Sequence, residues 1–423
     1  MLQIQLLRQN KELVLAGLKK KNFKEPELVD AIIALDEQRR RVQVESDELA
    51  SKVNAASKNI GQLMGQGKKD EAEQLKTEVA QYKEKTKELT QKLADLEAEQ
   101  HNLMVKLPNM PHDSVPAGKA AEDNITVREA GATPDLSAQK LPHWELAARY
   151  NLIDFELGNK ITGAGFPVYI GQGAKLQRAL ISYFLDYNIA AGYKEYYPPH
   201  MVNEASAYGT GSLPDKEGQM YYMPADDLYM IPTSEIPITN IYRDEIINNT
   251  DLPIKMTGYS PCFRREAGSY GKDVRGLNRV HQFDKVEIVQ IVHPDTSYDV
   301  QEQMVAHVEN LLTSLGLQHR VLLLCGGDMT FASSRTYDLE VYSAAQERWL
   351  EVSSVSNFET FQANRMKIRY RDENGKAQIA HTLNGSSLAL PRIMACIMEN
   401  HQTPEGIKIP PALVPYFGKN IIN

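Results

Sequence analysis

Two long stretches near the N-terminus repeat apolar residues at spacings that alternate between four and three. The first stretch covers residues 28–63 and the second covers residues 75–103. Apolar residues at the first and fourth positions of a heptad form one continuous hydrophobic seam along an α-helix. Gly61, Gly65 and Gly67 lie between the stretches, where a turn is expected. The pattern predicts an antiparallel pair of helices that forms an arm roughly 50 Å long.

The outer faces of this predicted arm carry charges of both signs. A coiled coil of unknown context most often serves in dimerisation or as a solvated spacer. Here the two helices are expected to pair with each other, which leaves the basic side chains of their outer faces free, but charge alone does not decide what these side chains bind. These side chains belong to Arg40, Arg41, Lys52, Lys58, Lys68, Lys69 and Lys76.

Composition restricts the class of protein. A chain of 423 residues exceeds one typical domain, and its 42% hydrophobic and 24% charged residues are usual for a soluble globular protein. No apolar run is long enough to span a bilayer, and the N-terminus lacks a signal-peptide core. Cys262, Cys325 and Cys396 form no CxxC pair, which fits a reducing compartment. We therefore expect a cytoplasmic protein, and the net charge of -8 argues against a general DNA-binding role.

Residues 107–118, LPNMPHDSVPAG, interrupt both periodicities and predict a linker. The expected organisation is an N-terminal domain over residues 1–106, with the arm at about 27–104, and a second domain over residues 119–423. In the second domain, strand-like runs at 255–263 and 280–292 flank a loop rather than a crossover helix, so they are expected to pair antiparallel. The predicted fold class is α+β, with helices flanking an antiparallel sheet.

Two segments of the second domain combine arginine with carboxylates and aromatic rings. The first is FRREAGSYGKDVRGLNRVHQFDKVE over residues 263–287, which also contains Lys272, and the second is HTLNGSSLALPR, which ends at Arg392. Guanidinium groups match phosphate oxygens in a bidentate manner. No GxxxxGK[ST] loop is present in the sequence, so phosphate binding would depend on arginines and a metal ion. Each residue alone is more often part of a structural ion pair, but their order and spacing favour one nucleotide site.

These segments carry a resemblance to a known family. FRRE with RVHQFDKVE resembles motif 2 of the class II aminoacyl-tRNA synthetases, and the NGSS-to-Arg392 segment resembles motif 3. The sequences of these motifs are similar to those of the bacterial-type seryl-tRNA synthetases, and the similarity extends over essentially the whole chain. The resemblance implies a class II catalytic domain that activates L-serine with ATP, releases pyrophosphate and transfers the seryl group to tRNA(Ser). It also implies that the arm binds the tRNA, with tRNA(Sec) as a further acceptor to be tested.

The resemblance also implies which residues bind ATP. Arg264 would hold the α-phosphate and the serine carboxylate, Glu266 would accept from the adenine amino group, and Phe283 would stack on the adenine. Arg264, Arg392 and Glu351 would be catalytic, and Glu351 with Ser354 would hold Mg²⁺. The full ATP-binding set comprises Arg264, Arg265, Glu266, Val280, Phe283, Glu351, Val352, Ser353, Ser354 and Arg392.

Serine recognition is implied by a second set of residues. Glu287 would accept from the serine hydroxyl, and an unpaired buried acceptor would then reject alanine. The implied serine-binding set comprises Thr233, Ser234, Glu235, Arg264, Glu287, Asn384 and Ser386. GYKEYYPP resembles motif 1, whose proline, here Pro199, implies a homodimer. No clustered Cys and His residues suggest zinc, so none is expected.

Some positions depart from the family pattern, and two other functions stay open. Val355 replaces a common cysteine, Asn364 a usual arginine, and Ser387 and Pro391 replace glycines near motif 3. A class II paralogue that loads a carrier protein would lack the long arm. A non-catalytic scaffold would have lost residues such as Arg264, Glu266, Glu351 or Arg392, and all of these are retained.

Overall fold

The computed structural model describes residues 1–215, 218–266 and 275–423, and the chain forms two compact units. Met1–Pro108 is the first unit and Asn109–Asn423 is the second. Each unit is described on its own below. No helix in the described part of the chain is both long and apolar enough to cross a membrane.

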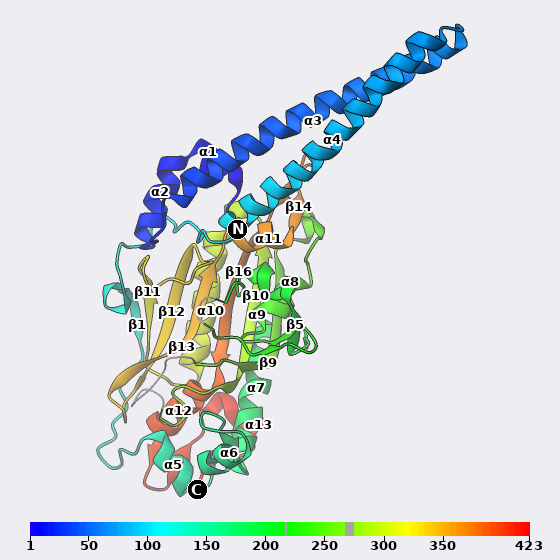
Figure 1. Cartoon of the computed structure of the whole chain (residues 1–423). Coiled ribbons are helices and arrows are strands. Elements are labelled where there is room, and N and C mark those ends of the chain that lie inside the picture. The colour runs from blue at the N-terminus through cyan, green and yellow to red at the C-terminus, as the bar shows by residue number, and fades with distance from the viewer. Residues whose placement is uncertain (216–217, 267–274) are drawn as a thin grey trace. The chain divides into compact units, whose positions relative to one another are not determined.

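The first unit is entirely helical. Two short helices, α1 (Ile4–Gln9) and α2 (Lys11–Lys20), precede the long helices α3 (Leu28–Gly65) and α4 (Lys69–Met104). Figure 1 shows α3 and α4 lying side by side along their length, which confirms the predicted antiparallel arm. Gly65 ends α3 as expected, whereas Gly61 lies within the helix rather than in the turn.

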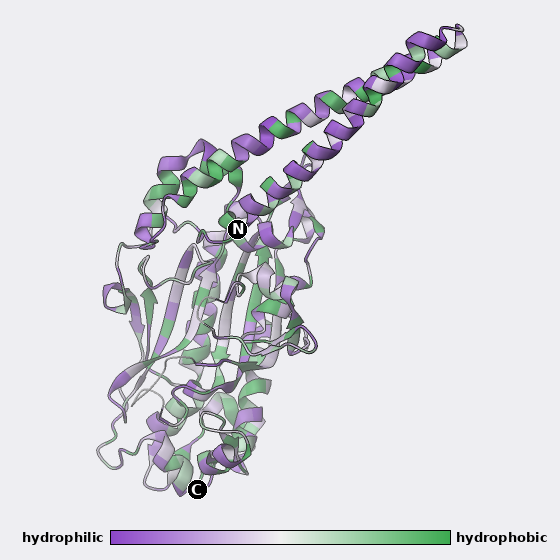
Figure 2. Cartoon of the chain, in the orientation of Figure 1, coloured by the Kyte–Doolittle hydropathy of each residue, from purple (hydrophilic) through white to green (hydrophobic). Residues whose placement is uncertain are grey.

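A narrow apolar seam holds α3 and α4 together. Leu35 and Val42 of α3 pack with Leu89 and Leu96 of α4, and each of these side chains is less than 9% exposed. The rest of each helix surface is mostly hydrophilic, as Figure 2 shows. The heptad pattern therefore defines both the pairing and the length of the arm, because no other apolar face is offered.

A buried carboxylate joins three helices near the open end of the hairpin. Asp36 on α3 is 1% exposed and accepts hydrogen bonds from Arg8 of α1 at 3.1 Å and from Gln100 of α4 at 3.3 Å. Arg39 lies one turn further along α3 and donates to the same carboxylate at 3.3 Å. A buried charge needs such partners, so this cluster fixes α1 against the hairpin.

The second unit is built on an eight-stranded sheet in the order β1-β11-β12-β13-β16-β10-β9-β4. All neighbouring strands are antiparallel except β4 and β9, which run parallel. The α+β prediction is therefore confirmed. In sheet order the strands are Ile125–Ala130, His319–Leu323, Arg335–Ser343, Arg348–Asn357, His381–Ala389, Gln282–Val292, Ile254–Phe263 and Lys194–Glu195.

Several helices contact this sheet, and three of them share its main hydrophobic core. They are α7 (Gln172–Ala190), α10 (Ser297–Ser314) and α12 (Leu390–Asn400). Phe184 of α7, Leu311 of α10 and Ile397 of α12 are fully buried in that core. Because the helices bury one face of the sheet, polar residues on the opposite face are left to form a site.

Shorter elements complete the second unit. The remaining helices are α5 (His143–Arg149), α6 (Phe155–Ile161), α8 (Glu204–Thr210), α9 (Glu235–Asn240), α11 (Thr360–Met366) and α13 (Val414–Phe417). The remaining strands are β2 (Ile153–Asp154), β3 (Val168–Tyr169), β5 (Met201–Asn203), β6 (Tyr222–Met223), β7 (Leu228–Met230), β8 (Ile246–Asn248), β14 (Arg369–Arg371), β15 (Ala377–Ile379), β17 (Gln402–Thr403), β18 (Gly406–Lys408) and β19 (Ile421–Ile422).

Two details bear on the predicted organisation. Strands β9 and β10 pair antiparallel, with Phe263 opposite Gln282 and Gly258 opposite Glu287, as the sequence indicates. Within the predicted linker, Asn109 is 3% exposed, and its side chain donates to the carbonyls of Ala332 at 2.9 Å and Phe358 at 2.8 Å. This part of residues 107–118 is therefore anchored to the second unit.

Replacement of Leu89 by alanine tests the seam. Removing this buried side chain should destabilise the helical hairpin by about 2–5 kcal/mol, because it leaves a cavity in a narrow interface. Hydrogen exchange of the α3 and α4 amides in the intact chain measures this loss directly. Lys87→Ala, at an exposed position on the same helix, is the control. Equal protection of these amides from hydrogen exchange in the two variants would contradict the conclusion that the apolar seam holds the two helices together.

Candidate active site

Strand β10 carries the centre of the site because its residues alternate between two environments. Phe283, Lys285 and Glu287 point to the open face of the sheet, whereas Val286 and Ile288 belong to the core under the helices. This is the ordinary period of two in a strand. The sequence QFDKVEIV therefore places one aromatic ring, one cation and one carboxylate in a row.

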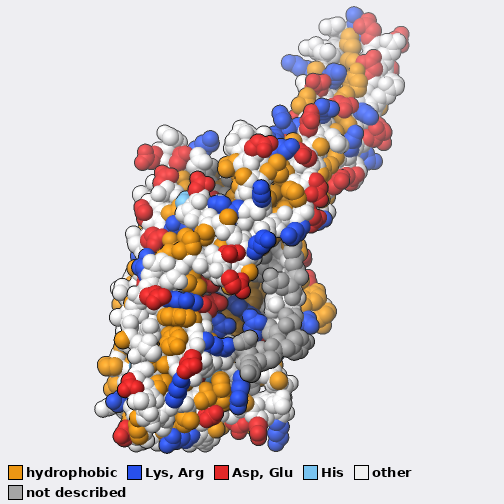
Figure 3. Space-filling view, turned by 90° about the vertical axis from the view of Figure 1, so that its left-hand side faces the viewer, with side chains coloured by type: hydrophobic (Ala, Val, Ile, Leu, Met, Phe, Trp, Pro, Cys, Tyr) orange, Lys and Arg blue, Asp and Glu red, His pale blue; other side chains and the backbone are white. Residues whose placement is uncertain are grey.

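A cavity of about 780 Å³ lies over this row. Residues of β10, β13 and β16, the segment after β9, the segment before α9 and the segment before β12 contribute to its wall. Figure 3 shows the hollowed face, with Lys and Arg side chains gathered at the hollow. Among the sequence-predicted residues, the cavity and an adjoining pocket are lined by Thr233, Glu235, Arg264, Glu266, Val280, Phe283, Glu287, Glu351, Val352, Ser353, Ser354, Asn384, Ser386 and Arg392.

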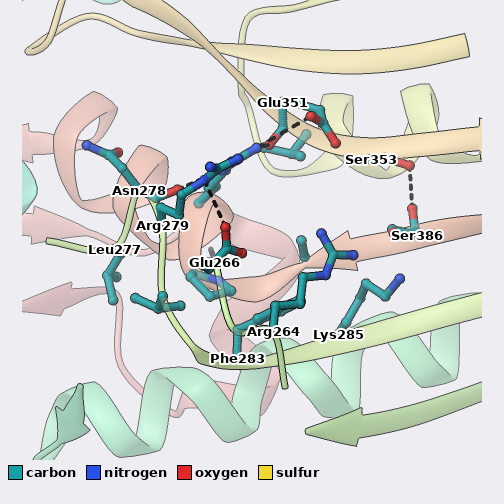
Figure 4. A pocket seen from close by; sticks show the side chains of 15 residues that line it. Arg264, Glu266, Leu277, Asn278, Arg279, Phe283, Lys285, Glu351, Ser353 and Ser386 are labelled. Carbon is teal, nitrogen blue, oxygen red and sulfur yellow. Dashed lines mark hydrogen bonds and ion pairs between the residues drawn. The ribbon is translucent and has the colours of Figure 1, made fainter. Parts of the chain in front are cut away.

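One half of the site carries arginine side chains, which Figure 4 shows from close by. Arg264 lies over the Phe283 ring, with its guanidinium carbon 5.2 Å from the ring centroid. None of the ion pairs within the described residues involves Arg264, so its charge is available to an anion. Arg279, in contrast, pairs with Glu266 at 3.1 Å.

Arg392 enters this half from the first turn of α12. Its Nε donates to the carbonyl of Asn278 at 3.0 Å, and its Nη1 donates to the carbonyl of Glu351 at 2.7 Å. The Glu351 carboxylate lies 3.7 Å from the same guanidinium. Helix α12 thus presents one cation between the segment that precedes β10 and the edge of β13.

The other half of the site is built around a buried carboxylate. Glu287 is 1% exposed and forms an ion pair with Lys285. Asn384 Nδ2 donates to Glu287 at 3.1 Å, Thr233 Oγ1 donates to it at 3.3 Å, and Lys285 Nζ lies 2.8 Å from Thr233 Oγ1. These contacts leave a small polar pocket that suits a ligand with a hydroxyl group.

Glu235 is a second carboxylate of the site; it is partly buried and stands at the start of α9. Burial, followed by the negative charge of Glu287, raises its pKa from 4.5 to about 7. Gln362 Nε2 donates to Glu235 at 2.6 Å and partly offsets this effect. A cationic ligand beside Glu235 would favour its ionised form.

Acidic groups also meet between β12 and β13. Asp338 lies opposite Ser354 in the register of these strands, and its Oδ1 has no hydrogen-bond partner among the described residues. Burial and, next, the charge of Glu351 raise the pKa of Asp338 well above its ordinary value. No group of three or more His, Cys, Asp or Glu residues suited to a metal ion occurs in the described segments.

Comparison with known proteins identifies the family. Residues 1–111 match the seryl-tRNA synthetase N-terminal domain, and residues 222–401 match the tRNA synthetase class II core domain (G, H, P, S and T). The serine–tRNA ligase of Salinibacter ruber is 50% identical over 99% of this chain and 98% of its own length. The serine–tRNA ligase of Neisseria meningitidis serogroup C is 47% identical over 99% and 98% of the two chains.

The chain belongs to the seryl-tRNA synthetase family. Solved structures agree with this assignment. The Pyrococcus horikoshii seryl-tRNA synthetase complexed with ATP has a TM-score of 0.91 at 32% identity, covering 100% of this chain and 99% of that one. The cytoplasmic serine–tRNA ligase of Naegleria fowleri with AMP has a TM-score of 0.88 at 28% identity, with the same coverage. The family and the class II fold predicted from the sequence are confirmed.

Two residues implied by the family resemblance do not line the cavity or the adjoining pocket. Ser234 is fully buried, and its hydroxyl bonds with the Ser260 hydroxyl at 2.7 Å. Arg265 is exposed, and its backbone amide donates to Gln219. Lys272, a basic residue of the motif 2 loop, lies outside the described residues.

Sequence reasoning missed Lys285 and Asp338. Lys285 stands two positions before Glu287, so strand periodicity alone would have placed the two side chains on one face. Asp338 has no comparable signal, because its proximity to Glu351 depends on the pairing of β12 with β13.

The departures from the family pattern lie in packed surroundings. Val355 is buried directly against Gly385, where a Cβ would meet the valine side chain at 2.8 Å. The Ser387 hydroxyl bonds with Asn188 Oδ1 at 2.9 Å, and Pro391 begins α12 beside the cavity. These substitutions leave the charged groups of the site in place.

Glu235→Gln tests the environment of Glu235. Between pH 4.5 and 7 the folded chain keeps a proton that the unfolded chain has released, so Glu235 lowers stability as pH rises. The glutamine variant lacks this penalty, so its free energy of unfolding at pH 8 should exceed that of the wild type by about 3 kcal/mol. The difference should vanish near pH 4.5. Denaturant unfolding across this range measures it, and a pH-independent difference would contradict the assignment.

Proposed function

We propose that the chain is an ATP-dependent serine–tRNA ligase and that the cavity on β10 is its active site. The serine carboxylate attacks the α-phosphate of ATP, so that an oxygen–phosphorus bond forms and the bond to pyrophosphate breaks. The terminal ribose hydroxyl of the tRNA then attacks the seryl carbonyl, and AMP leaves. Serine–tRNA ligases of Salinibacter ruber and Neisseria meningitidis, at 50% and 47% identity, support this assignment.

The observation that carries the proposal is one cavity with two chemically different halves. Its arginine-rich half suits a nucleotide polyphosphate, with Phe283 available to stack on a base and Glu266 to accept from its amino group. Its second half holds Glu287, fixed by Lys285 and Asn384. Arg264 lines both halves, so it can stabilise the negative charge that develops where the two substrates react.

The second half suits serine more than its close analogues. Glu287 accepts the side-chain hydroxyl, and Glu235, once ionised, pairs with the amino group, with Thr233, Asn384 and Ser386 completing the wall. Alanine offers no hydroxyl to the acceptor position of Glu287 that Lys285, Asn384 and Thr233 leave open, which is a penalty of up to about 10⁴-fold. Threonine differs by one methyl group, so steric exclusion supplies only about 1–3 kcal/mol.

The edge of the cavity also fits Mg²⁺. Glu351 and Ser354 line it, and the unpartnered Oδ1 of Asp338 lies on the neighbouring strand. Mg²⁺ takes oxygen ligands and is usually held by one or two carboxylates with substrate phosphates, which matches this small donor set. When bound, the ion would neutralise phosphate charge. Glu351 also contacts Arg392, whose guanidinium is proposed to bind the γ-phosphate.

The first unit is proposed to bind tRNA(Ser) along its helical arm. Arg40, Lys52, Lys58 and Lys69 are exposed, and none of the ion pairs within the described residues uses them. Arg41, Lys68 and Lys76 form exposed pairs with glutamates, which are weak enough to exchange for phosphates. A rigid rod with spaced cations suits a helical RNA backbone recognised by shape.

Three further properties belong to this proposal. A homodimer would use the region of Pro199, which is exposed beside Tyr197, itself 74% exposed. Action in a reducing cytoplasm is consistent with the three free cysteines, all buried. tRNA(Sec) is proposed as a second acceptor to be assayed beside tRNA(Ser).

Glu287→Ala should abolish serine activation while sparing nucleotide binding. Serine-dependent ATP–pyrophosphate exchange should fall by about 10² or more, because the hydroxyl acceptor is lost and Lys285 is left without its partner. Calorimetric ATP affinity should stay within about twofold of the wild type, because Glu287 lies in the other half of the site. Unchanged serine turnover in this variant would contradict the pocket assignment.

Separate assays of the two steps test the division between the units. ATP–pyrophosphate exchange should be specific for serine over threonine and alanine. A variant that lacks residues 24–106 should retain this exchange but should no longer charge total tRNA, because the phosphate contacts of the arm are lost. Exchange without charging in the intact chain would instead favour a ligase that loads a carrier protein. No exchange with any amino acid would indicate a non-catalytic scaffold.

A further inference from the structure

A buried His–Glu pair lies behind the nucleotide half of the site. His143 opens α5 and Glu399 lies in the last turns of α12, and both side chains are 0% exposed. Neither residue lines the cavity. Their nearest connection to it runs through residues 275–279, the segment that leads into β10.

The hydrogen bonds of Glu399 account for its burial without a permanent cation. Its carboxylate accepts from the His143 backbone amide at 2.9 Å, from His143 Nδ1 at 2.7 Å and from Gln346 Nε2 at 2.9 Å. The Ser343 hydroxyl supplies a fourth donor. A carboxylate has about four acceptor positions, so Glu399 is saturated and rigidly held.

These contacts define the state of the His143 ring. Its Nε2 accepts the backbone N–H of Leu277 at 2.8 Å, so that nitrogen carries no proton. The ring proton is therefore on Nδ1, where it is donated to Glu399. Glu399 thus selects the tautomer that leaves Nε2 free to hold Leu277, which is the usual way that a carboxylate orients a histidine.

The segment around Leu277 follows the surface of α5 closely. A Cβ added to Gly276 would lie 2.2 Å from His143 Nε2, and the backbone of this glycine has a φ of +67°. The guanidinium of Arg275 stacks over the Trp144 ring at 4.6 Å. Three consecutive residues are therefore fixed by the first two residues of α5.

The same segment leads directly to groups of the nucleotide site. The Asn278 carbonyl accepts from Arg392 Nε at 3.0 Å, and the next residue, Arg279, pairs with Glu266. The Asn278 side chain bonds with Gln346 at 3.0 Å, and Gln346 donates in turn to Glu399. Arg392 and Glu399 are seven residues apart on α12, so they lie on one side of that helix.

We propose that His143, oriented by Glu399, is a positioning residue for the nucleotide. Its contact with Leu277 fixes the segment 276–279 against α12, and this fixed segment holds Arg392 and Arg279 in their places. This inference rests on the function proposed above. It adds that the buried pair of His143 and Glu399 determines the positions of the arginines in the nucleotide half of the site. Loss of the Leu277 contact should weaken ATP binding and leave serine binding unaffected, because Glu287 and its partners lie on other elements.

Two matched variants separate the contacts of the ring. In His143→Asn the amide can replace the Nδ1 donor to Glu399 but cannot reach Leu277, whereas in His143→Gln the amide oxygen can replace the Nε2 acceptor. His143→Asn should raise the KM for ATP by about tenfold, the scale expected for displaced binding groups. In His143→Gln the KM for ATP should stay within about threefold of the wild-type value. The KM for serine should stay within about twofold of the wild-type value in both variants.

A substitution of the partner segment gives an independent test. Gly276→Ala should raise the KM for ATP because its methyl group collides with His143. In a chain that already carries His143→Ala, Gly276→Ala should raise the KM for ATP much less, because the collision is gone. Gly375→Ala is the control, because its φ is +74° and nothing lies within 4 Å of an added Cβ. The control should leave both KM values unchanged.

The outcomes separate this inference from the proposed function. If the wild type shows no serine-dependent exchange, the proposed function fails, and calorimetric ATP affinity of the same variants still tests the inference. Equal ATP affinities for His143→Asn and His143→Gln, at similar melting temperatures, would overturn it and leave a purely structural pair. If His143→Asn does not fold, additive effects of Gly276→Ala and His143→Ala would overturn the inference.

Discussion

The site depends on how one negative charge is kept in the middle of a sheet. Glu287 is almost completely buried on β10, and a carboxylate there is tolerated only because Lys285, Thr233 and Asn384 surround it. Those partners come from β10 itself, from the segment before α9 and from β16. The correct pairing of distant strands is thus a condition for neutralising the charge.

The sheet also explains why the two halves of the cavity act together. Strand β10 carries Phe283 in one half and Glu287 in the other, four residues apart along a single rigid element. Helix α12 has a similar double role, because Arg392 lines the arginine-rich half while Glu399 holds His143, which accepts a hydrogen bond from Leu277 in the segment before β10. Functional groups held by regular elements keep their separations better than groups on free loops.

Local periodicity was sufficient to predict the arm and the pairing of β9 with β10. Heptad spacing depends only on neighbouring residues, and the spacing around Arg264 and Glu287 carried the family resemblance. Ser234 was implied by the family resemblance of the segment 233–235, but its hydroxyl bonds with the buried Ser260 hydroxyl instead of lining the cavity. His143 and Asp338 could not be predicted, because their partners are distant in sequence and meet only through tertiary packing.

The contrast between the cores of the two units has a consequence for behaviour under heat. The hairpin is held by a thin row of apolar contacts, whereas the sheet and its helices share an extensive interior. Cooperative units of unequal stability open separately. Warming would therefore release the helices proposed to bind tRNA first and leave an enzyme that still consumes ATP but has lost its acceptor. Wasteful adenylate synthesis, rather than simple inactivity, is the expected early symptom of thermal damage.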